Sequence, residues 1–151
     1  MNHLARQNVY EQLKIDEGVV YEVYKDHLGY KTLGVGHLIT EDDPEYGHSI
    51  GTKVSEARVK QCFENDLNTA VSECSIMFGQ SIWNTFPMEV KEICVNMMFN
   101  LGRPRFSKFK KTINYLEEHN WKAAGKEARD SVWYNQVGDR AERLCTRLER
   151  A

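Results

Sequence analysis

Two carboxylic acids near the beginning of the chain, Glu17 and Asp26, have residue types and spacing suited to acid–base chemistry. Glu17 ends a predicted helix, where the negative end of the helix dipole favours the protonated form of a carboxyl group. Asp26 follows a predicted strand beside a glycine turn, where we expect a solvated, ionised carboxylate. Such a pair can cleave a glycosidic bond, because one acid protonates the leaving oxygen while the other directs water or stabilises the sugar cation.

Taken alone the pair is a weak signal, because in a chain with 22 acidic residues such a Glu and Asp are usually surface charges. The strand that follows adds support. Side chains alternate along a strand, so Thr32, Gly34 and Gly36 are predicted to share one face while the residues between them pack inward. Glycines inside a strand allow close approach of a ligand. We therefore predict an open strip beside the two acids on which a polysaccharide lies.

Hydrophobic spacing and the glycine and proline positions divide the chain into elements. A first helix is predicted from about residue 3 to Glu17, ended by Gly18. Residues 19–40 predict two or three short antiparallel strands, and residues 41–53 a loop. The remaining segments are predicted helices: from a Ser55 cap to about Met77, from a Thr85 cap through Pro87 to Gly102, and over residues 106–118, 120–130 and 139–149.

This order of elements predicts a single α+β domain over residues 1–151. Its parts are a small lobe with a short antiparallel sheet (about 14–54), a long connecting helix (about 55–77), and an all-helical lobe (78–151 with the first helix). A chain of this length is sufficient for one sizeable core or two small lobes. We expect the ligand site in a cleft between the lobes, the usual position for one.

Composition and charge are those of an ordinary globular protein, with 41% hydrophobic and 28% charged residues and a net charge of −2. Residues 1–76 hold 7 Lys and Arg against 13 Asp and Glu, and residues 77–151 hold 13 against 9. The basic second half could favour an anionic polymer, and a solvated surface explains it equally well.

The four cysteines indicate neither a disulfide nor a metal site. Cys62 and Cys74 fall on one predicted helix, about 18 Å apart, which is beyond the reach of a disulfide. No histidine lies at ligand spacing, so we predict reduced core thiols and no metal or cofactor. The first residues form an amphipathic pattern, not a signal peptide, and no apolar run approaches the roughly 20 residues of a membrane helix.

Several segments resemble the lysozymes (endolysins) of T-even bacteriophages, glycoside hydrolase family 24. The resemblance covers nearly the whole chain in order, and several of the segments contain rare residue types. The pattern E-x8-D-x5-T that marks the family's active site is met by Glu17, Asp26 and Thr32. The other matching segments are I-D-E-G, Y-K-D, T-L-G-V-G-H-L, Phe63 to Asp66, N-M-M-F with Leu101-Gly102, S-x-W-Y-N-Q from Ser131, and R-A-x-R from Arg140.

The resemblance implies a lysozyme-like fold and a muramidase that hydrolyses the β-1,4 bond between N-acetylmuramic acid and N-acetylglucosamine in bacterial peptidoglycan. Glu17 would be the general acid. Asp26 would activate the attacking water and Thr32 would hold it on the far side of the sugar, with inversion at the anomeric carbon. Arg140 would pair with the carboxylate of Glu17 or Asp16.

Other positions receive roles from the same resemblance. Leu38, Phe99, Thr112 and Glu127 would line the substrate site. His37 and Asp66 would form a structural salt bridge between the hairpin and the long helix. A catalytic His–Asp couple is the weaker interpretation of that pair, because no serine or cysteine nucleophile lies in a recognisable elbow.

Two other functions stay open. A lytic transglycosylase cuts the same bond without water, and Asp26 with Thr32 argues for hydrolysis instead. A non-catalytic module that binds cell wall or nucleic acid is suggested by a basic cluster, Arg103 to Lys111, with Phe106 and Phe109 interleaved. Such a run is usually a solvated helix face with the phenylalanines turned inward. Trp121, Trp133 and Tyr134 likewise indicate core positions more often than sugar platforms.

The resemblance also implies a biological setting: host lysis and phage release. The enzyme would accumulate as a monomer in the host bacterial cytoplasm and reach the periplasm through lesions made by a holin, a functional partner without direct contact. We expect the peptidoglycan glycan strand as its partner, and neither nucleic acid nor membrane. The segment between hairpin and long helix and the carboxyl-terminal tail are both shorter than in the family's best-known member, which leaves the catalytic triplet untouched.

Overall fold

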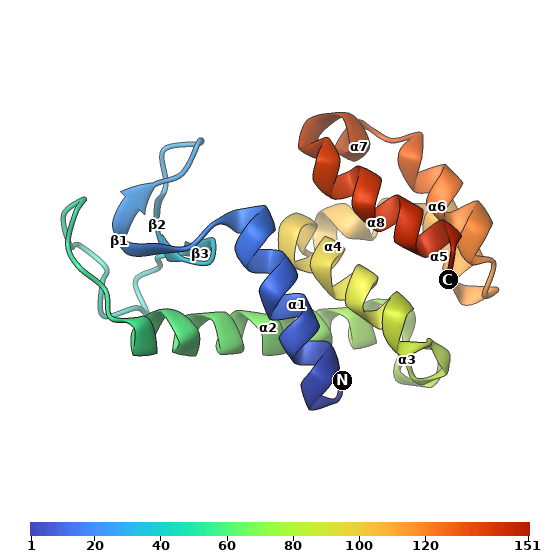
Figure 1. The fold of residues 1–151 in the computed structure, drawn as a ribbon, viewed down its shortest axis with the longest axis horizontal. Coiled ribbons are helices and arrows are strands. Elements are labelled where there is room, and N and C mark those ends of the chain that lie inside the picture. The colour runs from blue at the N-terminus through green and yellow to red at the C-terminus, as the bar shows by residue number, and fades with distance from the viewer. The chain divides into compact units, whose positions relative to one another are not determined.

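The computed structural model describes every residue from Met1 to Ala151. Packing of the Cα trace divides the chain into two compact units. We call residues 10–68 the hairpin unit, and residues 1–9 together with 69–151 the helical unit. In chain order the elements are α1 (His3–Glu17), β1 (Val20–Lys25), β2 (Lys31–Gly34), β3 (His37–Leu38), α2 (Glu56–Phe78), α3 (Gln80–Thr85), α4 (Met88–Phe106), α5 (Lys110–Glu117), α6 (Trp121–Arg129), α7 (Val132–Val137) and α8 (Asp139–Glu149) (Figure 1).

The hairpin unit contains one antiparallel sheet in the order β1-β2-β3. Tyr24 of β1 lies opposite Thr32 of β2, and Thr32 lies opposite Leu38 of β3. The register shifts between Val20 and Tyr24, which marks an irregularity in β1. The regular elements of the chain are eight helices and one small antiparallel sheet, so the predicted α+β class is confirmed.

The prediction that one strand contains Thr32, Gly34 and Gly36 is wrong beyond Gly34. The chain ends β2 at Gly34 and reverses through Val35 and Gly36 before β3 begins at His37. Gly34 has φ 60° and Gly36 has φ 63°, a conformation that costs other residues free energy. The glycines therefore serve a tight turn, and the alternation of faces ends at Gly34.

The predicted start of the long helix α2 is confirmed. The hydroxyl oxygen of Ser55 accepts a hydrogen bond from the backbone N–H of Arg58 at 3.1 Å, which satisfies one of the free N–H groups at the helix start. In the hairpin unit, Val59 and Leu67 of α2 are buried together with Leu13, Val23 and Leu33 of the other elements. Their spacing is the amphipathic pattern from which the helix was predicted.

The helical unit packs α5, α6 and α8 against one another, with α4 and α7 beside α8 (Figure 1). Helices α6 and α8 come close to each other at Gly125. A Cβ on Gly125 of α6 would lie 2.9 Å from the backbone oxygen of Cys145 in α8, so only a residue without a side chain fits there. The buried side chains of α8, including Leu144 and Leu148, repeat at helical spacing on one face.

Two short helices, α3 and α7, were not predicted, and one predicted cap is wrong. Thr85 does not begin α4. It ends α3, and its hydroxyl donates to the backbone oxygen of Ile82. The helix α4 begins at Met88, after Pro87, with no side-chain cap. Gly102 interrupts it with φ 72° and ψ 159°, which agrees with the predicted stop at this glycine, although helical turns resume as far as Phe106.

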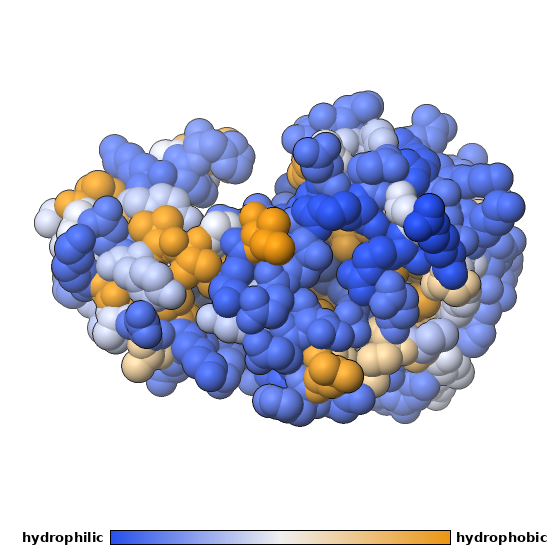
Figure 2. Space-filling view, in the orientation of Figure 1, coloured by the Kyte–Doolittle hydropathy of each residue, from blue (hydrophilic) through white to orange (hydrophobic).

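All four cysteines are buried, free thiols, as predicted. None of the helices has the length and apolar content that a membrane crossing requires. The face shown in Figure 2 is mainly hydrophilic, with hydrophobic side chains in scattered groups. Scattered apolar groups of this kind are ordinary on a protein surface.

Candidate active site

The carboxylate of Asp26 is fixed by the backbone of the β1–β2 hairpin. Its Oδ1 accepts hydrogen bonds from the N–H groups of Leu28 and Tyr30, both at 2.9 Å. The N–H of Asp26 in turn donates to the carbonyl oxygen of Tyr30 at 2.9 Å. The second carboxylate oxygen, Oδ2, makes no hydrogen bond to the protein, so it is available to accept a proton or a hydrogen bond from a ligand.

Thr32 presents an acceptor beside this hairpin. Its Oγ1 donates to the carbonyl oxygen of Tyr30 at 2.9 Å. A hydroxyl has one proton and two lone pairs. Because the proton is engaged, the remaining function of Oγ1 toward a bound water is to accept. Tyr30 thus ties Asp26 and Thr32 to the same short stretch of backbone.

The predicted open strip of Thr32, Gly34 and Gly36 is wrong. Thr32 is only 3% exposed, and Gly34 is buried. A Cβ on Gly34 would lie 2.9 Å from Cγ1 of Val59, so the long helix covers this glycine. Gly34 and Gly36 do allow other groups to come close to the backbone, but these groups belong to the protein itself and not to a ligand.

Glu17 is positioned by the end of α1 and by the turn at Gly36. The helix stops at Gly18, whose φ is 76°. A Cβ on Gly36 would lie 3.0 Å from Oε2 and 3.3 Å from Cδ of Glu17, closer than side-chain atoms normally come. The absence of a side chain at position 36 therefore allows the Glu17 carboxylate to lie against the β2–β3 turn.

Tyr24 lies near both acids. The pKa of its hydroxyl is raised above the ordinary value of 10.0, first by burial and then by the negative charges of Glu17 and Asp26. The charges of the two sequence-predicted carboxylates therefore act on one phenol, which is itself opposite Thr32 in the sheet.

His37 is held between two carboxylates. Its Nδ1 lies 2.7 Å from Oδ2 of Asp66 on α2, and its Nε2 lies 2.9 Å from Oδ2 of Asp43. The pKa of His37 is raised above 6.5, chiefly by the hydrogen bond to Asp66. Arg58 joins the same group, donating to Asp43 at 3.0 Å and to both oxygens of Glu45 at 2.9 Å. The structure thus brings His37 and Asp66 together, and adds partners that the sequence did not reveal.

Three atoms of this network could also face a metal ion. The ligand atoms of His37, Asp43 and Cys62 lie within 4.8 Å of one another. However, both ring nitrogens of His37 already meet carboxylates, and Arg58 brings a positive charge to Asp43. Burial raises the pKa of the Cys62 thiol to about 11, which disfavours the thiolate that a metal needs. These three residues are therefore better explained as part of a hydrogen-bonded network than as a metal site.

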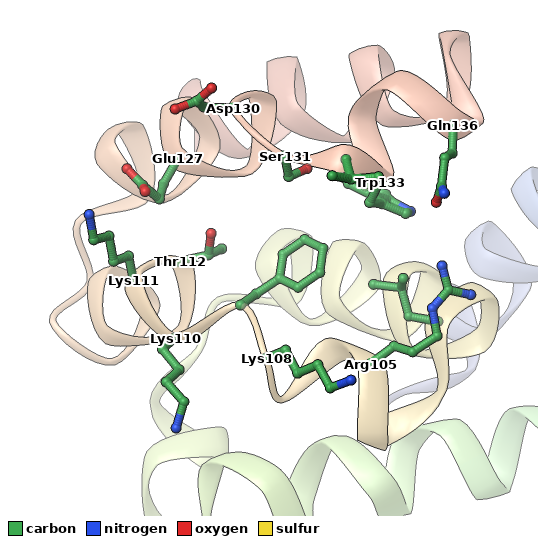
Figure 3. Close-up of a pocket in the computed structure, with 13 residues that line it drawn as sticks. Arg105, Lys108, Lys110, Lys111, Thr112, Glu127, Asp130, Ser131, Trp133 and Gln136 are labelled. Carbon is green, nitrogen blue, oxygen red and sulfur yellow. The ribbon is translucent and has the colours of Figure 1, made fainter.

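In the helical unit, a pocket of about 620 Å³ contains two of the predicted substrate residues, Thr112 of α5 and Glu127 of α6 (Figure 3). Phe109 and Trp133 line it as well, with their ring centroids 6.0 Å apart. Trp133 is 3% exposed, as a core residue would be, and its indole N–H donates to Asn100 at 2.8 Å. It is therefore both a core residue and part of a pocket wall.

The other predicted residues lie elsewhere. Phe99 is on α4 and does not line this pocket, and Leu38 is on β3 in the hairpin unit with half its surface exposed. Arg140 on α8 is 7% exposed, and its Nε donates to Oδ1 of Asn96 at 2.9 Å. Its pairing with Asp16 or Glu17 stays a prediction.

Comparison with known proteins identifies the family. The family model described as phage lysozyme matches residues 14–150, nearly the whole chain. This chain belongs to the phage lysozyme family. It is accordingly a lysozyme-type glycosidase.

This phage-lysozyme family member is similar to proteins of different sizes and sources. It is 31% identical over 156 residues to "Probable T4-type lysozyme 2" of Dictyostelium discoideum, covering 92% of each chain. It is 27% identical over 150 residues to "Pre-baseplate central spike protein Gp5" of Enterobacteria phage T4, covering 89% of this chain and 26% of that protein. It is 28% identical over 127 residues to "Peptidoglycan hydrolase gp36" of Pseudomonas phage phiKMV, covering 84% and 13%. The region similar to this chain thus makes up most of the first of these proteins and a small part of the other two.

Several residues around this lysozyme's acids were missed from the sequence. Tyr24 falls within the predicted strands, and Asp43, a partner of His37, falls within the predicted loop, and neither position carries a signal of its contacts. Gly36 was singled out for the approach of a ligand, whereas it makes room for Glu17. The two-residue separation of Tyr24 and Asp26 was the one hint in the sequence, although Asp26 itself lies just beyond the end of β1.

Proposed function

We propose that this lysozyme is a muramidase that hydrolyses the β-1,4 bond between N-acetylmuramic acid and N-acetylglucosamine in bacterial peptidoglycan. The observation that carries the proposal is the pair of acceptors in the β1–β2 hairpin, Oδ2 of Asp26 and Oγ1 of Thr32. The name of the phiKMV relative, a peptidoglycan hydrolase, supports the same substrate.

The two acceptors suit the activation of water. A water that donates one proton to Asp26 and the other to Thr32 has a lone pair left to attack the anomeric carbon. Asp26 takes the proton as the bond forms, acting as general base. Because Thr32 cannot donate while its proton is held by Tyr30, it orients the water without competing for its lone pair.

Glu17 supplies the second half of the reaction as general acid, giving its proton to the leaving sugar oxygen. Attack by a water on the face opposite the leaving group inverts the configuration at the anomeric carbon. Arg140 is proposed to pair with Glu17 or Asp16 as a positioning residue. No metal or cofactor is needed for this chemistry, since both protons are handled by carboxyl groups.

The experiment that tests the reaction analyses the ends of digested peptidoglycan. A hydrolase leaves reducing muramic acid ends that carry oxygen from solvent, which mass spectrometry in H₂¹⁸O detects. Proton NMR during the first turnovers should show the inverted anomer. Anhydromuramic ends without solvent oxygen would instead establish the alternative, a lytic transglycosylase, and binding without new ends would establish a non-catalytic module.

We further propose host lysis as the biological role, with the lysozyme held in the bacterial cytoplasm until a holin opens the inner membrane. Two of the similar proteins come from phages, one of them named a peptidoglycan hydrolase, while others come from Dictyostelium discoideum, which is not a phage. Expression in bacteria with and without a holin tests it. Rapid lysis should require both proteins and an intact Glu17, and lysis without the holin would contradict the proposed route.

A further inference from the structure

The backbone of Tyr30 is shared by the two acceptors of the hairpin unit. Its N–H donates to Oδ1 of Asp26 at 2.9 Å. Its carbonyl oxygen accepts from the N–H of Asp26 and from Oγ1 of Thr32, both at 2.9 Å. Three hydrogen bonds therefore fix the backbone of Tyr30 relative to both groups of the proposed chemistry, and its side chain begins at a constant distance from them.

The register of the sheet shows on which face the side chain of Tyr30 lies. Tyr24 lies opposite Thr32, and Thr32 lies opposite Leu38, so these three side chains share one face. Asp26 and Tyr30 continue the pairing just beyond the ends of β1 and β2, because the N–H of Asp26 donates to the carbonyl oxygen of Tyr30. Side chains two residues apart along a strand share a face, which places Tyr30 beside Asp26 on the face of Thr32.

The residue between Tyr30 and Thr32 supports this assignment. The ammonium group of Lys31 donates to the carbonyl oxygen of His48 at 2.7 Å. The side chain of Lys31 is therefore directed toward the loop between β3 and α2. Because neighbouring side chains along a strand point to opposite faces, Tyr30 is directed away from this loop.

The side chain of Tyr30 has no role within the protein. It is 59% exposed, and it makes no hydrogen bond, ring stack or cation–π contact. An exposed tyrosine is by itself ordinary on a protein surface. Tyr21 and Tyr46 are also exposed, at 45% and 61%, but neither has a backbone hydrogen bond to Asp26 or Thr32. Tyr30 alone combines an uncovered ring with a backbone tied to both acceptors.

We infer that the ring of Tyr30 stacks against a sugar ring of the glycan strand and holds the strand over Asp26 and Thr32. The inference rests on the proposed function. The rings of a β-1,4-linked glycan carry their substituents near the ring plane, which leaves C–H groups on both faces. The negative face of an aromatic ring attracts such C–H groups, and its large area is removed from water by the contact. The hydroxyl of a tyrosine can meanwhile stay in water or bind a sugar hydroxyl.

The backbone and the side chain of Tyr30 have different expected effects on the kinetics. A stacking contact is made in the bound substrate and in the transition state alike, so its loss raises KM and leaves kcat nearly unchanged. A displaced backbone would move Asp26 and Thr32, and would lower kcat. Tyr30 is thus a substrate-binding residue, and the two constants separate this role from a structural one.

The first test measures release of reducing ends from soluble peptidoglycan fragments. Tyr30→Ala should raise KM about tenfold and change kcat by less than about twofold. Tyr30→Phe keeps the ring, so its KM should lie within about twofold of that of the unmodified lysozyme. Tyr46→Ala removes an exposed ring elsewhere in the hairpin unit and should change neither constant.

The outcomes separate this inference from the proposed function. If the proposed function is wrong, the unmodified protein releases no reducing ends. If only the inference is wrong, Tyr30→Ala and Tyr46→Ala have the same KM, or Tyr30→Ala lowers kcat at an unchanged KM.

Direct binding gives a second measurement that does not depend on an alanine variant. In Glu17→Gln, which should bind peptidoglycan without cleaving it, a short soluble fragment should shift the ring resonances of Tyr30 and leave those of Tyr46 in place. The signals are assigned by their loss in Tyr30→Phe and Tyr46→Phe. The inference is overturned if the fragment shifts other resonances of the protein but not those of Tyr30, or shifts both tyrosines equally.

Discussion

The hairpin unit and the helical unit use charge in opposite ways. In the hairpin unit, Asp26 is held by two backbone N–H groups, and His37 lies between two carboxylates. In the helical unit, the cations around the pocket extend into solvent on long side chains without partners. The groups of the proposed chemistry are thus held by hydrogen bonds, whereas the cations around the pocket are exposed to solvent, namely Arg105, Lys108, Lys110 and Lys111.

This difference has a physical reason. A proton transfer or a directed water loses most of its rate when a group moves by about an ångström, so its groups need backbone anchors and rigid elements. Attraction between a cation and a carboxylate falls off gradually with distance, so it tolerates a flexible side chain. The hairpin unit thus has the backbone anchors that the proposed chemistry needs.

The largest expected effect comes from Glu17→Gln, which removes the proton donor and keeps the shape. Cleavage of peptidoglycan, measured by release of reducing ends, should fall about a thousandfold. The thermal midpoint should stay near that of the unmodified protein. If the variant still cleaved peptidoglycan, the assignment of the catalytic acid to the hairpin unit would be contradicted.

The variants Gly36→Ala and Gly34→Ala test which glycine of the hairpin unit makes room for the proposed general acid. Both glycines have nearly the same φ, so both variants carry the same backbone strain. The methyl group at 36 meets Glu17, whereas at 34 it meets Val59. We expect Gly36→Ala to lower kcat about tenfold and to alter the pH profile of kcat, since it displaces a reacting group.

Gly34→Ala should instead lower the free energy of unfolding by about 1–3 kcal/mol with a smaller change in kcat, because it overpacks the contact with the long helix. Equal kcat values for the two variants would show that Gly36 has no special relation to the acid. Steady-state kinetics and urea denaturation on the same samples decide between these results.

His37→Gln tests the charge network by its pH dependence. Because the folded-state pKa of His37 is raised above 6.5, its pairing stabilises fully below about pH 6.5 and loses this contribution as the pH rises through the raised value. The variant should therefore be less stable than the unmodified protein by about 2 kcal/mol near pH 5.5, and by less near pH 9. Urea denaturation at both pH values measures the difference, and a larger effect at the higher pH would contradict the ion-pair account.

The smallest effects are expected at two helix caps, one in each unit. Ser55 accepts a hydrogen bond from Arg58 N–H at 3.1 Å, and Ser131 accepts one from Tyr134 N–H at 3.2 Å. Ser55→Ala and Ser131→Ala should each lower the free energy of unfolding by about 1 kcal/mol. Ser131 also donates to Ala128, so its variant should lose slightly more, which denaturation of the two single variants would reveal.

Local patterns were sufficient for the longer elements. The apolar spacing of α1, α2 and α8 and the cap at Ser55 depend on neighbours along the chain, and they were predicted within a few residues. The helices α3 and α7 were missed because six residues make fewer than two turns and carry little periodic signal. Thr85 was misassigned because a threonine before a proline fits the end of one helix as well as the start of the next.

The order of residues by itself determined the α+β class, the free thiols and the two acids with Thr32 as candidates. Only the tertiary structure decided which groups lie close together. It places the carboxylate of Glu17 against Gly36 and a carboxylate oxygen of Asp43 near the second ring nitrogen of His37. It also leaves the cations that line the pocket of the helical unit without ion-pair partners. The reason is that turns and caps depend on residues a few positions away, whereas packing and ion pairing depend on distances between residues that folding alone brings together.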